Sequence, residues 1–326
     1  MNVVIVGAGI MGITFATLAK ELNPALKITI IERLSGPAKS NSSVFNNAGT
    51  GHEANCELNY TPVDEEVIEV EKAVHIHAQF NIAKQFWAYL VNKGIIKDAA
   101  NFIHQTKHCT IVHQNSIDEL KLRFEEMSQH HFFEGMNYSE DHDEIKSWIP
   151  YTMENRPKSE KMAATMIKTG TDVNFQSLTE EMAAYLVQQE DVEIRYNTHV
   201  SRVHKSPMKQ WLIETKQGDK KERFKGDVLF VGAGGGAFPL LKLSHLPDRS
   251  RFAGFPVGGR FLLAKISEED AKHYSAKTYG KAKVGAPPMS VPHLDLRAAE
   301  GKHYLLFGPF ATFMPVLEKG RGFIEY

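Results

Sequence analysis

The first stretch of the chain, Met1 to Glu32, has the clearest pattern of apolar and polar positions. Asn2 to Val6 is a short apolar run rich in β-branched residues, which is typical of a buried parallel strand. From Ile13 to Leu22 the apolar residues fall mostly on one helical face, and Lys27 to Ile31 forms a second apolar run. The pattern therefore predicts a strand, a helix and a second strand, in this order.

Helical periodicity returns further along the chain. In Val63 to Lys93 apolar residues recur every three or four positions, which predicts one long helix ended by Gly94. Ser177 and Glu180 have the spacing of a capping box at the start of another helix. The other helices that the pattern predicts are Ser116–His130, Asp141–Trp148 and Glu268–Ser275.

Short apolar runs bounded by turn residues predict several further strands. A hairpin turn is expected near Gln217–Asp219, and from Ser244 onward short strands alternate with glycine and proline turns. Helices and strands thus mix along the whole chain, as they do in α/β proteins. The further strands are Phe132–Tyr138, Ala163–Thr169, Val192–Tyr196, Thr198–His204, Gln210–Thr215 and Asp227–Val231.

Gly7, Gly9 and Gly12 occur in G-x-G-x-x-G spacing at the first predicted turn from strand to helix, with Ala8 inside the motif. Such glycines allow a tight turn, close approach of a pyrophosphate and close packing of helix on strand. Glu32 ends the second strand, 20 residues after Gly12, where a carboxylate can accept a hydrogen bond from a ribose hydroxyl. The stretch predicts a dinucleotide site for FAD or NAD, and a glycine turn without a ligand is the alternative.

Two later stretches fit the same site. The strand Asp227–Val231 runs into Gly232, Ala233 and Gly234, which suits a second approach to a dinucleotide or, alternatively, a simple turn. Val44 to Pro62 is rich in asparagine, glycine, threonine and serine. Its composition fits an ordered cofactor loop and a plain surface loop equally well.

Composition narrows the class of protein. The 326 residues suit about two domains, and 42% apolar with 24% charged residues is typical of a soluble globular protein. The net charge of -1 gives no reason to expect a nucleic-acid partner, and the 15 histidines include no block with metal-ligand spacing. Cys56 and Cys109 are far apart and are expected to be reduced thiols in a cytoplasmic compartment. We expect neither a signal peptide nor a membrane-spanning segment, although contact with a membrane surface stays open.

The stretch NNAGTGHEANCELNYTP, Asn46 to Pro62, strongly resembles the corresponding segment of FAD-dependent malate:quinone oxidoreductases. The family resembles, more distantly, L-2-hydroxyglutarate oxidases and other D-amino-acid-oxidase-like flavoproteins. Further stretches that match in the right order are GTDVNFQSLT (Gly170–Thr179), VGAGGGAFPLL (Val231–Leu241), GFPVGGRFL (Gly254–Leu262), MSVPHLDLR (Met289–Arg297) and LLFGPFATF (Leu305–Phe313).

The resemblance implies FAD as the cofactor and an α/β fold in which a Rossmann-type FAD-binding domain is interleaved with a mixed-sheet substrate domain. Residues 1–82 and 163–241 would form the FAD-binding domain, and residues 83–162 and 242–326 the substrate domain. The expected cofactor contacts are Gly7, Ala8, Gly9, Gly12, Glu32, Asn47, Ala48, Gly49, Thr50, Gly51, Gly232, Ala233 and Gly234.

The resemblance also implies the reaction: oxidation of (S)-malate to oxaloacetate in the tricarboxylic acid cycle, with electrons passed from FAD to membrane quinone. The protein would be peripheral on the cytoplasmic face of the cell membrane. Such chemistry needs a base and cations for carboxylates, and no metal. His293 and Arg297 are the expected base and carboxylate anchor, Arg260 is a second cation and His52 is a further candidate for proton transfer or flavin contact.

Members of the resembled family continue well beyond the position of Tyr326, and the ending EKGRGFIEY departs from their pattern. We therefore expect a truncated form with little or no turnover on its own. Two alternatives stay open: an L-2-hydroxyglutarate oxidase-like enzyme, whose substrate has one more methylene, and a non-catalytic FAD-binding fragment.

Overall fold

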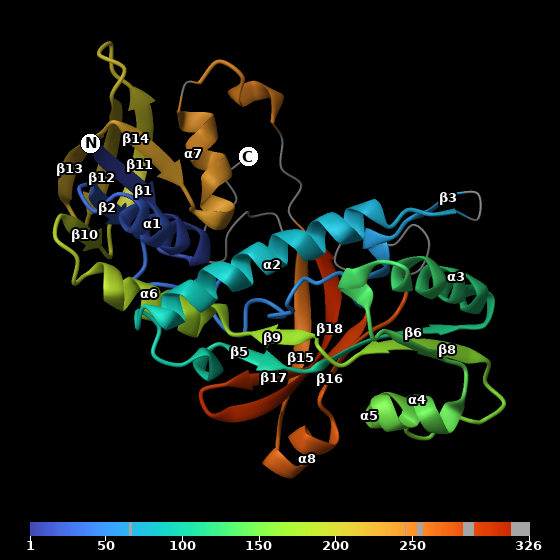
Figure 1. Ribbon diagram of the computed structural model, residues 1–326. Helices are drawn as coiled ribbons and strands as arrows, with labels where there is room; N and C mark the ends of the chain where they lie inside the picture. Colours follow the sequence, from blue (N-terminus) through green and yellow to red (C-terminus); the bar gives the residue numbers. More distant parts are fainter. Residues whose placement is uncertain (65–66, 245, 253–256, 283–289, 314–326) are drawn as a thin grey trace.

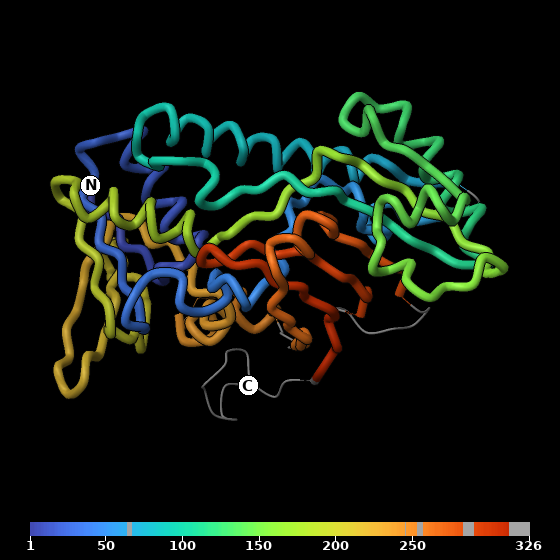
Figure 2. The backbone as a smooth tube through the Cα atoms, turned by 90° about the horizontal axis from the view of Figure 1, so that it is seen from below, coloured from blue at the N-terminus to red at the C-terminus, as the bar shows by residue number. Residues whose placement is uncertain are grey.

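The computed structural model describes residues 1–64, 67–244, 246–252, 257–282 and 290–313. A small parallel sheet lies at one end of the molecule and a larger mixed sheet at the other, with the long helix α2 (Glu71–Asn92) running between them (Figure 1). Seen from below, the chain passes several times from one end to the other (Figure 2). Of the predicted stretches, Gly254–Pro256, Met289 and the ending Glu318–Tyr326 lie outside the described residues.

The parallel sheet has the strand order β10-β2-β1-β14, and all its neighbouring strands pair in parallel. Helix α1 (Ile10–Leu22) connects β1 to β2, as the opening pattern predicts, and α6 (Phe175–Leu186) packs on α1. The strands are β1 (Asn2–Val6), β2 (Lys27–Ile31), β10 (Val192–Arg195) and β14 (Val228–Val231).

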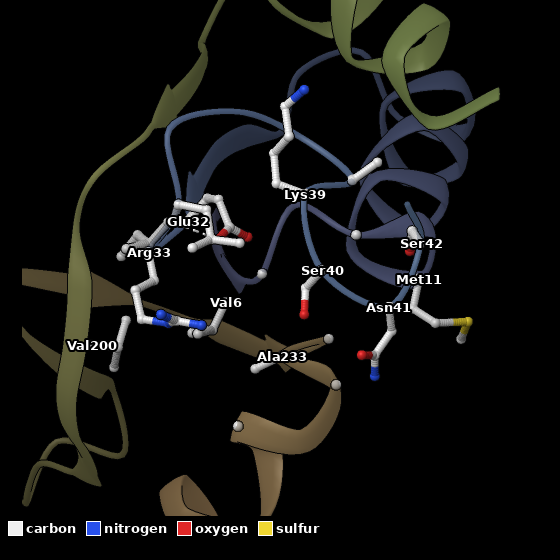
Figure 3. A pocket seen from close by; sticks show the side chains of 18 of the residues that line it. Val6, Met11, Glu32, Arg33, Lys39, Ser40, Asn41, Ser42, Val200 and Ala233 are labelled. Atoms are coloured by element: carbon white, nitrogen blue, oxygen red, sulfur yellow. Dashed lines mark hydrogen bonds between the residues drawn. The ribbon is translucent and has the colours of Figure 1, made fainter. Parts of the chain in front are cut away.

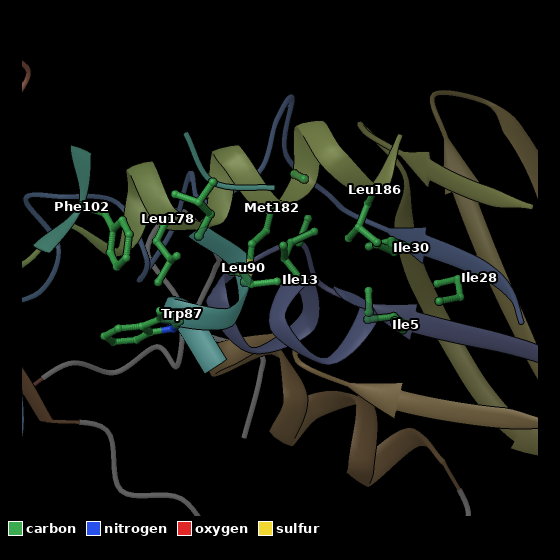
Figure 4. Close-up of a cluster of buried hydrophobic side chains, with 14 of the residues drawn as sticks. Ile5, Ile13, Ile28, Ile30, Trp87, Leu90, Phe102, Leu178, Met182 and Leu186 are labelled. Carbon is green, nitrogen blue, oxygen red and sulfur yellow. The ribbon is translucent and has the colours of Figure 1, made fainter. Parts of the chain in front are cut away.

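Helices from three parts of the sequence cover one face of this sheet (Figure 4). Ile5 and Ile30 of the strands, Leu90 of α2, and Met182 and Leu186 of α6 are all fully buried in this cluster. Each such side chain contributes roughly 1.5–3 kcal/mol by leaving water. Apolar burial is therefore the main stabilising force at this end of the molecule.

A three-stranded antiparallel sheet, in the order β11-β12-β13, packs against the other face of the parallel sheet. Val203 and Ile213 of this sheet join Val4 and Ile31 in one buried cluster, together with Leu240 of α7 (Ala237–Leu243). The predicted turn near Gln217–Asp219 is confirmed. The strands are β11 (His199–Lys205), β12 (Trp211–Gln217) and β13 (Lys220–Gly226).

The large sheet has seven strands in the order β15-β18-β17-β16-β6-β8-β7. All its neighbours pair antiparallel except β16 and β6, which are parallel. Helices α3 (Ile117–Ser128), α4 (His142–Trp148) and α8 (Glu268–His273) pack against it, and α5 (Pro150–Met153) packs on α4. The strands are β6 (Lys107–His113), β7 (Asn137–Ser139), β8 (Met162–Ile167), β15 (Val257–Ile266), β16 (Ala276–Tyr279), β17 (His293–Ala299) and β18 (Lys302–Phe313).

Two small strand pairs and several short 3-10 helices complete the described fold. Strands β3 (Val63–Asp64) and β4 (Val67–Ile68) form one pair, and β5 (Ile103–Gln105) with β9 (Thr171–Val173) the other. The 3-10 helices are η1 (Leu58–Tyr60), η2 (Ala99–Asn101), η3 (Gln114–Ser116), η4 (His131–Phe133), η5 (Gly234–Gly236) and η6 (Arg249–Arg251).

Three predicted elements are wrong in detail. The helix expected from Val63 begins only at Glu71, because the residues before it pair as β3 and β4. Helix α6 begins at Phe175 and is capped by Asn174, whose side chain accepts from the N–H of Ser177, so the capping box at Ser177 does not form. The strand expected over Phe132–Tyr138 is a 3-10 turn followed by β7, with Gly135 at a φ of 83° between them.

Candidate active site

The first glycine turn brings the start of α1 against the end of β1. Gly7 has a φ of 102°, a conformation that glycine adopts without a steric penalty. A Cβ atom on Gly12 would lie 2.0 Å from the carbonyl oxygen of Gly7, so helix and strand approach more closely than a side chain allows. Gly9 stands at the N-cap position, and Ser42 Oγ accepts from the N–H of Ile10 at 2.9 Å. The turn has the backbone geometry of a phosphate-binding turn.

The second glycine turn lies directly beside the first. The N–H of Gly232 donates to the carbonyl of Val6 at 2.8 Å. A Cβ atom on Gly7 would lie 2.5 Å from the carbonyl oxygen of Gly232. Ala233 and Gly234 follow at the start of a 3-10 turn, with Gly234 at a φ of 54°. The structure thus places the two glycine-rich stretches on adjacent parallel strands, at their carboxyl ends.

Glu32 lies at the end of β2, next to this double turn. Its Oε2 accepts from the N–H of Ala8 at 2.8 Å, and its Oε1 accepts from the N–H of Leu34 at 2.7 Å. Each carboxylate oxygen can accept more than one hydrogen bond. The carboxylate is therefore fixed in place and keeps acceptor capacity toward the neighbouring cavity.

A cavity of about 260 Å³ opens over the two turns (Figure 3). Val6, Glu32 and Ala233 line it, together with the loop that carries Ser40 and Asn41. A second cavity of about 530 Å³ shares part of this lining, including Ser40 and Asn41, and extends to Phe45, Gly258 and Phe261 of the large-sheet side. An elongated ligand thus finds room from the parallel sheet toward the seven-stranded sheet.

The stretch Val44 to Glu57, called here the docked loop, lies on one face of the seven-stranded sheet. Lys277 Nζ donates to the carbonyl of Ala48 at 2.9 Å, and the hydroxyls of Thr50 and Tyr279 lie 2.8 Å apart. The loop also pairs with β9, since its Gly49 carbonyl accepts from the N–H of Val173 at 2.6 Å. The composition left open whether this stretch is an ordered loop, and the structure shows it ordered by these contacts.

The far end of the docked loop is held by two further polar side chains. Thr110 Oγ1 on β6 donates to the carbonyl of Cys56 at 3.1 Å. Arg123 of α3 is fully buried, and its Nη2 donates to the carbonyl of Ala54 at 3.1 Å while its Nε donates to Thr61 Oγ1 at 2.8 Å. Burial lowers the pKa of Arg123 to about 10, so this guanidinium stays charged at neutral pH.

Arg297 on β17 is wholly inaccessible to solvent and contacts the same loop. Its Nε donates to the carbonyl of Val44 at 3.0 Å, its Nη2 to Asn47 Oδ1 at 3.1 Å and its Nη1 to Asp172 Oδ1 at 3.1 Å. A Cβ atom on Gly49 would lie 1.3 Å from Nη1, so the guanidinium fills the space that this glycine leaves. All three nitrogens of the expected carboxylate anchor thus have partners within the chain.

His293 lies on the same face of β17 as Arg297 and is 6% exposed. Its ring stacks on Tyr279 with the centroids 4.4 Å apart and the planes 3° from parallel. Its Nδ1 lies 2.8 Å from Oδ2 of Asp295. Burial raises the pKa of Asp295, but Lys277 and His293 lower it by more, so the net shift is below its usual range.

The other two candidates lie apart from this pair. Arg260 is exposed on β15, which is separated from β17 by β18 and pairs there with Phe310. His52 is half exposed in the docked loop, with its Nδ1 3.1 Å from Oε1 of Glu57. Burial raises the pKa of Glu57, and the contact with His52 outweighs it, so the net shift is downward.

The sequence reasoning missed Asp295 and Lys277, whereas Asp172, in the matched stretch GTDVNFQSLT, could from sequence either order a loop beside the cofactor or cap a turn. Asp295 had a signal, because residues two apart on a strand share a face and Asp295 lies midway between His293 and Arg297. Lys277 had no local signal, and the spacing around Asp172 does not indicate its contacts with Lys277 and Arg297. Lys277 and Asp172 reach this face only through the pairing of β16 with β17 and the position of β9 beside the docked loop.

The described residues contain no group of three or more His, Cys, Asp or Glu side chains that could hold a metal ion. Cys56 and Cys109 are both buried and unpaired with each other. Among the described helices, none combines the length and the apolar character that crossing a bilayer requires.

A sequence model of the malate:quinone oxidoreductase family matches residues 1–326. The chain is 45% identical over 316 residues to a probable malate:quinone oxidoreductase of Granulibacter bethesdensis, covering 96% of this chain and 63% of that protein. It is 45% identical over 329 residues to a relative of the same description in Flavobacterium psychrophilum, covering 99% and 66%. The chain thus spans just under two thirds of the length of these relatives.

Solved structures show the fold. L-α-glycerophosphate oxidase of Mycoplasma pneumoniae, solved with FAD bound, superimposes with a TM-score of 0.68 at 17% identity, covering 95% of this chain and 71% of that one. Glycine oxidase of Geobacillus kaustophilus gives a TM-score of 0.63 at 13% identity, with the same coverage. These likenesses confirm the predicted fold class, an α/β protein that combines a Rossmann-type part with a mixed sheet, as in D-amino-acid-oxidase-like proteins.

Proposed function

The chain belongs to the malate:quinone oxidoreductase family, and we propose that it binds FAD and oxidises (S)-malate to oxaloacetate, with quinone as the final electron acceptor. One observation supports this more than any other. The residues just before the docked loop contact the double glycine turn, since the N–H of Ala38 donates to the carbonyl of Ala8 and Ser42 Oγ accepts from the N–H of Ile10. The docked loop that follows them lies on the face of the large sheet that carries His293, so a dinucleotide site and a buried imidazole belong to one continuous structure.

The residues present fit FAD. Gly7, Gly9 and Gly12 leave space for a pyrophosphate at the start of α1, and Glu32 is fixed where it can accept from a ribose hydroxyl. The remaining contacts proposed for FAD are Ala8, Asn47, Ala48, Gly49, Thr50, Gly51, Gly232, Ala233 and Gly234. Bound FAD would supply a hydride acceptor. We propose residues 1–82 and 163–241 as the FAD-binding domain and residues 83–162 and 242–326 as the substrate domain.

The side chains of this chain would move the proton. His293 accepts the hydroxyl proton of malate, since a buried imidazole is a suitable general base. Arg297 is wholly buried and engaged at three nitrogens, so we assign it to hold the docked loop in place rather than to bind malate. The exposed Arg260 and the half-exposed His52 stay candidates for the carboxylate anchor and for further proton transfer.

Rapid mixing of the FAD-loaded protein with (S)-malate under anaerobic conditions tests the proposed oxidation. Bleaching of the flavin absorbance measures one turnover, and (R)-malate is the control. His293→Gln is expected to slow bleaching on the order of 10²–10⁴-fold while FAD stays bound. Faster bleaching with L-2-hydroxyglutarate than with malate would favour that substrate instead. No bleaching with either acid would contradict the proposed oxidation and favour the alternative of a non-catalytic FAD-binding fragment.

Titration with FAD and with NADH tests the cofactor separately. Glu32→Ala is expected to weaken FAD binding by ~1.5–3 kcal/mol, roughly a factor of 10–100, since the ribose loses a charge-assisted hydrogen bond. Binding of NADH without binding of FAD would contradict the assignment.

We also propose peripheral attachment to the inner face of the cell membrane, because quinones reside in the bilayer. Co-sedimentation with liposomes tests this, with and without a quinone in the lipid. A protein that stays in the supernatant under both conditions would contradict it.

A further inference from the structure

A row of five ionisable side chains crosses the face of the large sheet beneath the docked loop. From His293, the row passes through Asp295 at 2.8 Å, Lys277 at 3.7 Å from Asp295, Asp172 at 2.9 Å from Lys277 and Arg297 at 3.1 Å from Asp172. All five residues are at most 6% exposed. A buried row of this kind is costly unless its charges are matched.

Strand pairing builds this row. His293, Asp295 and Arg297 alternate along β17 with the apolar Leu294 and Leu296, which pack into a core cluster on the opposite face. In the antiparallel pair of β16 with β17, Lys277 stands opposite Asp295 and Tyr279 stands opposite His293. The contact of Asp295 with His293 is therefore set by the sheet rather than by a flexible surface arrangement.

The charges balance within the row. Lys277 and Arg297 carry two positive charges, and Asp172 and Asp295 carry two negative ones. Lys277 Nζ also donates to the carbonyl of Ala48, and Asp172 accepts from Arg297, so both are engaged with the docked loop or its anchor. Asp295 differs from Asp172, because it is the carboxylate of the row that adjoins an imidazole.

The polar atoms between His293 and Asp295 lack other partners. Within the part of the chain described, no other group forms a hydrogen bond with the carboxylate oxygens of Asp295 or with Nδ1 of His293. The ionisable groups that act on the Asp295 carboxylate include Lys277 from β16, His108 from β6 and Cys56 of the docked loop. The rings of Tyr279 and Phe261 lie against the imidazole of His293. The groups that can satisfy each other are thus the Nδ1–H of the imidazole and the Asp295 carboxylate.

We propose that Asp295 is a positioning residue that holds His293 with its proton on Nδ1 and leaves Nε2 free as the proton acceptor, which rests on the proposed function. When malate is oxidised, its O–H bond breaks and the proton goes to Nε2, while its C–H bond breaks as the carbonyl forms and bound FAD would accept the hydride. Asp295 then adjoins the imidazolium and stabilises its charge.

Nitrogen-15 NMR of histidine-labelled protein reads the tautomer of His293 directly, without any turnover. His293→Gln identifies its signals among those of the 15 histidines. The wild-type protein is expected to carry the neutral His293 proton on Nδ1. In Asp295→Asn the proton is expected to shift in part or wholly to Nε2, because the amide can donate to Nδ1.

Asp172→Asn is the matched control. It also removes a buried carboxylate beside Lys277, but Asp172 does not adjoin His293. This variant is expected to keep the His293 tautomer. In anaerobic rapid mixing, Asp295→Asn should slow flavin reduction on the order of 10²–10⁴-fold with little change in the malate concentration for half-maximal rate. Asp295→Glu should recover part of the rate.

Several results would overturn the proposal. The first is a wild-type His293 with its proton on Nε2, a result that does not depend on Asp295→Asn and so holds even where that variant does not fold. The second is an unchanged tautomer and rate in Asp295→Asn, and the third is the same tautomer shift in Asp172→Asn. If malate does not reduce the flavin of the wild-type protein, the proposed function fails, while the NMR comparison still decides the role of Asp295.

Discussion

The double glycine turn and the charged face of the large sheet are joined by the stretch that leads into the docked loop, but they are built in opposite ways. The glycine turn depends on missing side chains: Gly7 and Gly12 let backbone atoms approach where a Cβ atom would clash. The charged face depends on large side chains, because Arg297 and Lys277 are among the largest fully buried ones in the described residues.

The first of the two glycine turns and the charged face also differ in the sequence distance that they span. The turn from β1 to α1 lies within a few residues, whereas Lys277 reaches Ala48 across 229 positions and Arg297 reaches Val44 across 253. The turn from β1 to α1 can form together with α1, whereas the charged face can form only when the strands of the large sheet have paired. We therefore expect the glycine turn to be sensitive to added side-chain atoms and the charged face to be sensitive to the loss of a charge.

The largest effect is expected from Lys277→Met. Removing this ammonium leaves the buried Asp295 without its main counter-charge, so the free energy of unfolding should fall by about 3–5 kcal/mol. Lys158→Met is the control, since Lys158 pairs with Asp143 at 2.6 Å with both side chains exposed, and its loss should change the unfolding free energy far less. Urea unfolding measures both, and equal losses would remove the distinction between buried and exposed pairs.

A smaller loss is expected from Gly12→Ala. The added Cβ would lie 2.0 Å from a backbone oxygen, so α1 must shift, at a cost of roughly 3 kcal/mol in unfolding free energy together with the loss of FAD binding. Gly36→Ala is the control, because its nearest neighbour would be the flexible Lys39 side chain at 3.4 Å. Thermal unfolding and flavin titration show the result. FAD binding that survives in Gly12→Ala would refute the close-packing argument.

Acid should weaken the charged face before the glycine turn. Burial lowers the pKa of His108, on β6 next to Lys277, to about 4. Between this value and the ordinary value near 6.5 the unfolded chain binds more protons, so stability falls as pH falls. From pH 7 to pH 5 the contribution of His108 to the loss should be about 2 kcal/mol, and His108→Gln should remove this contribution while that of His77, whose pKa burial also lowers to about 4, remains. Hydrogen exchange in β6 and β1 measures it, with the exposed His75→Gln as control. A His108→Gln variant with unchanged acid sensitivity would contradict this assignment.

The smallest effect is expected at the N-terminal cap of α6, the helix that packs on α1 next to the glycine turn. Asn174→Ala removes the acceptor for the N–H of Ser177 and should cost about 1 kcal/mol. Ser177→Ala should cost less, because the hydroxyl of Ser177 does not cap the helix. Denaturant unfolding of both variants measures the two losses of unfolding free energy. A larger loss of unfolding free energy in Ser177→Ala than in Asn174→Ala would support the capping box that the sequence predicts.

The fold was predictable from sequence where the signal is local. The opening strand, helix and strand follow from a few residues each, and α4 and β14 are close to their predicted bounds. The long helix was overextended because Val67 and Val70 fit helical spacing while Val67 in fact pairs in β4. Long-range pairing decides such cases, and a single sequence does not carry it.

In the candidate site too, residues with a local signal were predictable from sequence and residues placed by long-range pairing were not. The glycines and Glu32 could be found from spacing alone, and their roles stay predictions. His293 and Arg297 came from family resemblance, and the alternation around Asp295 was available but not used. The engagement of Arg297 with Val44, Asn47 and Asp172 could not be predicted, because it requires the register of β17 against a loop that precedes it by most of the chain.

The long sequence distance between the docked loop and the residues Lys277 and Arg297 that hold it affects how the protein folds during synthesis on the ribosome. Synthesis at about 5–20 residues per second means that Arg297 emerges roughly 10–50 seconds after Val44. During that time β1, α1 and β2 can form and pair, but β14 and β17 are still missing for much of it, and Arg297 cannot yet hold the start of the docked loop. Cofactor capture is therefore expected to be one of the last events in the assembly of the molecule.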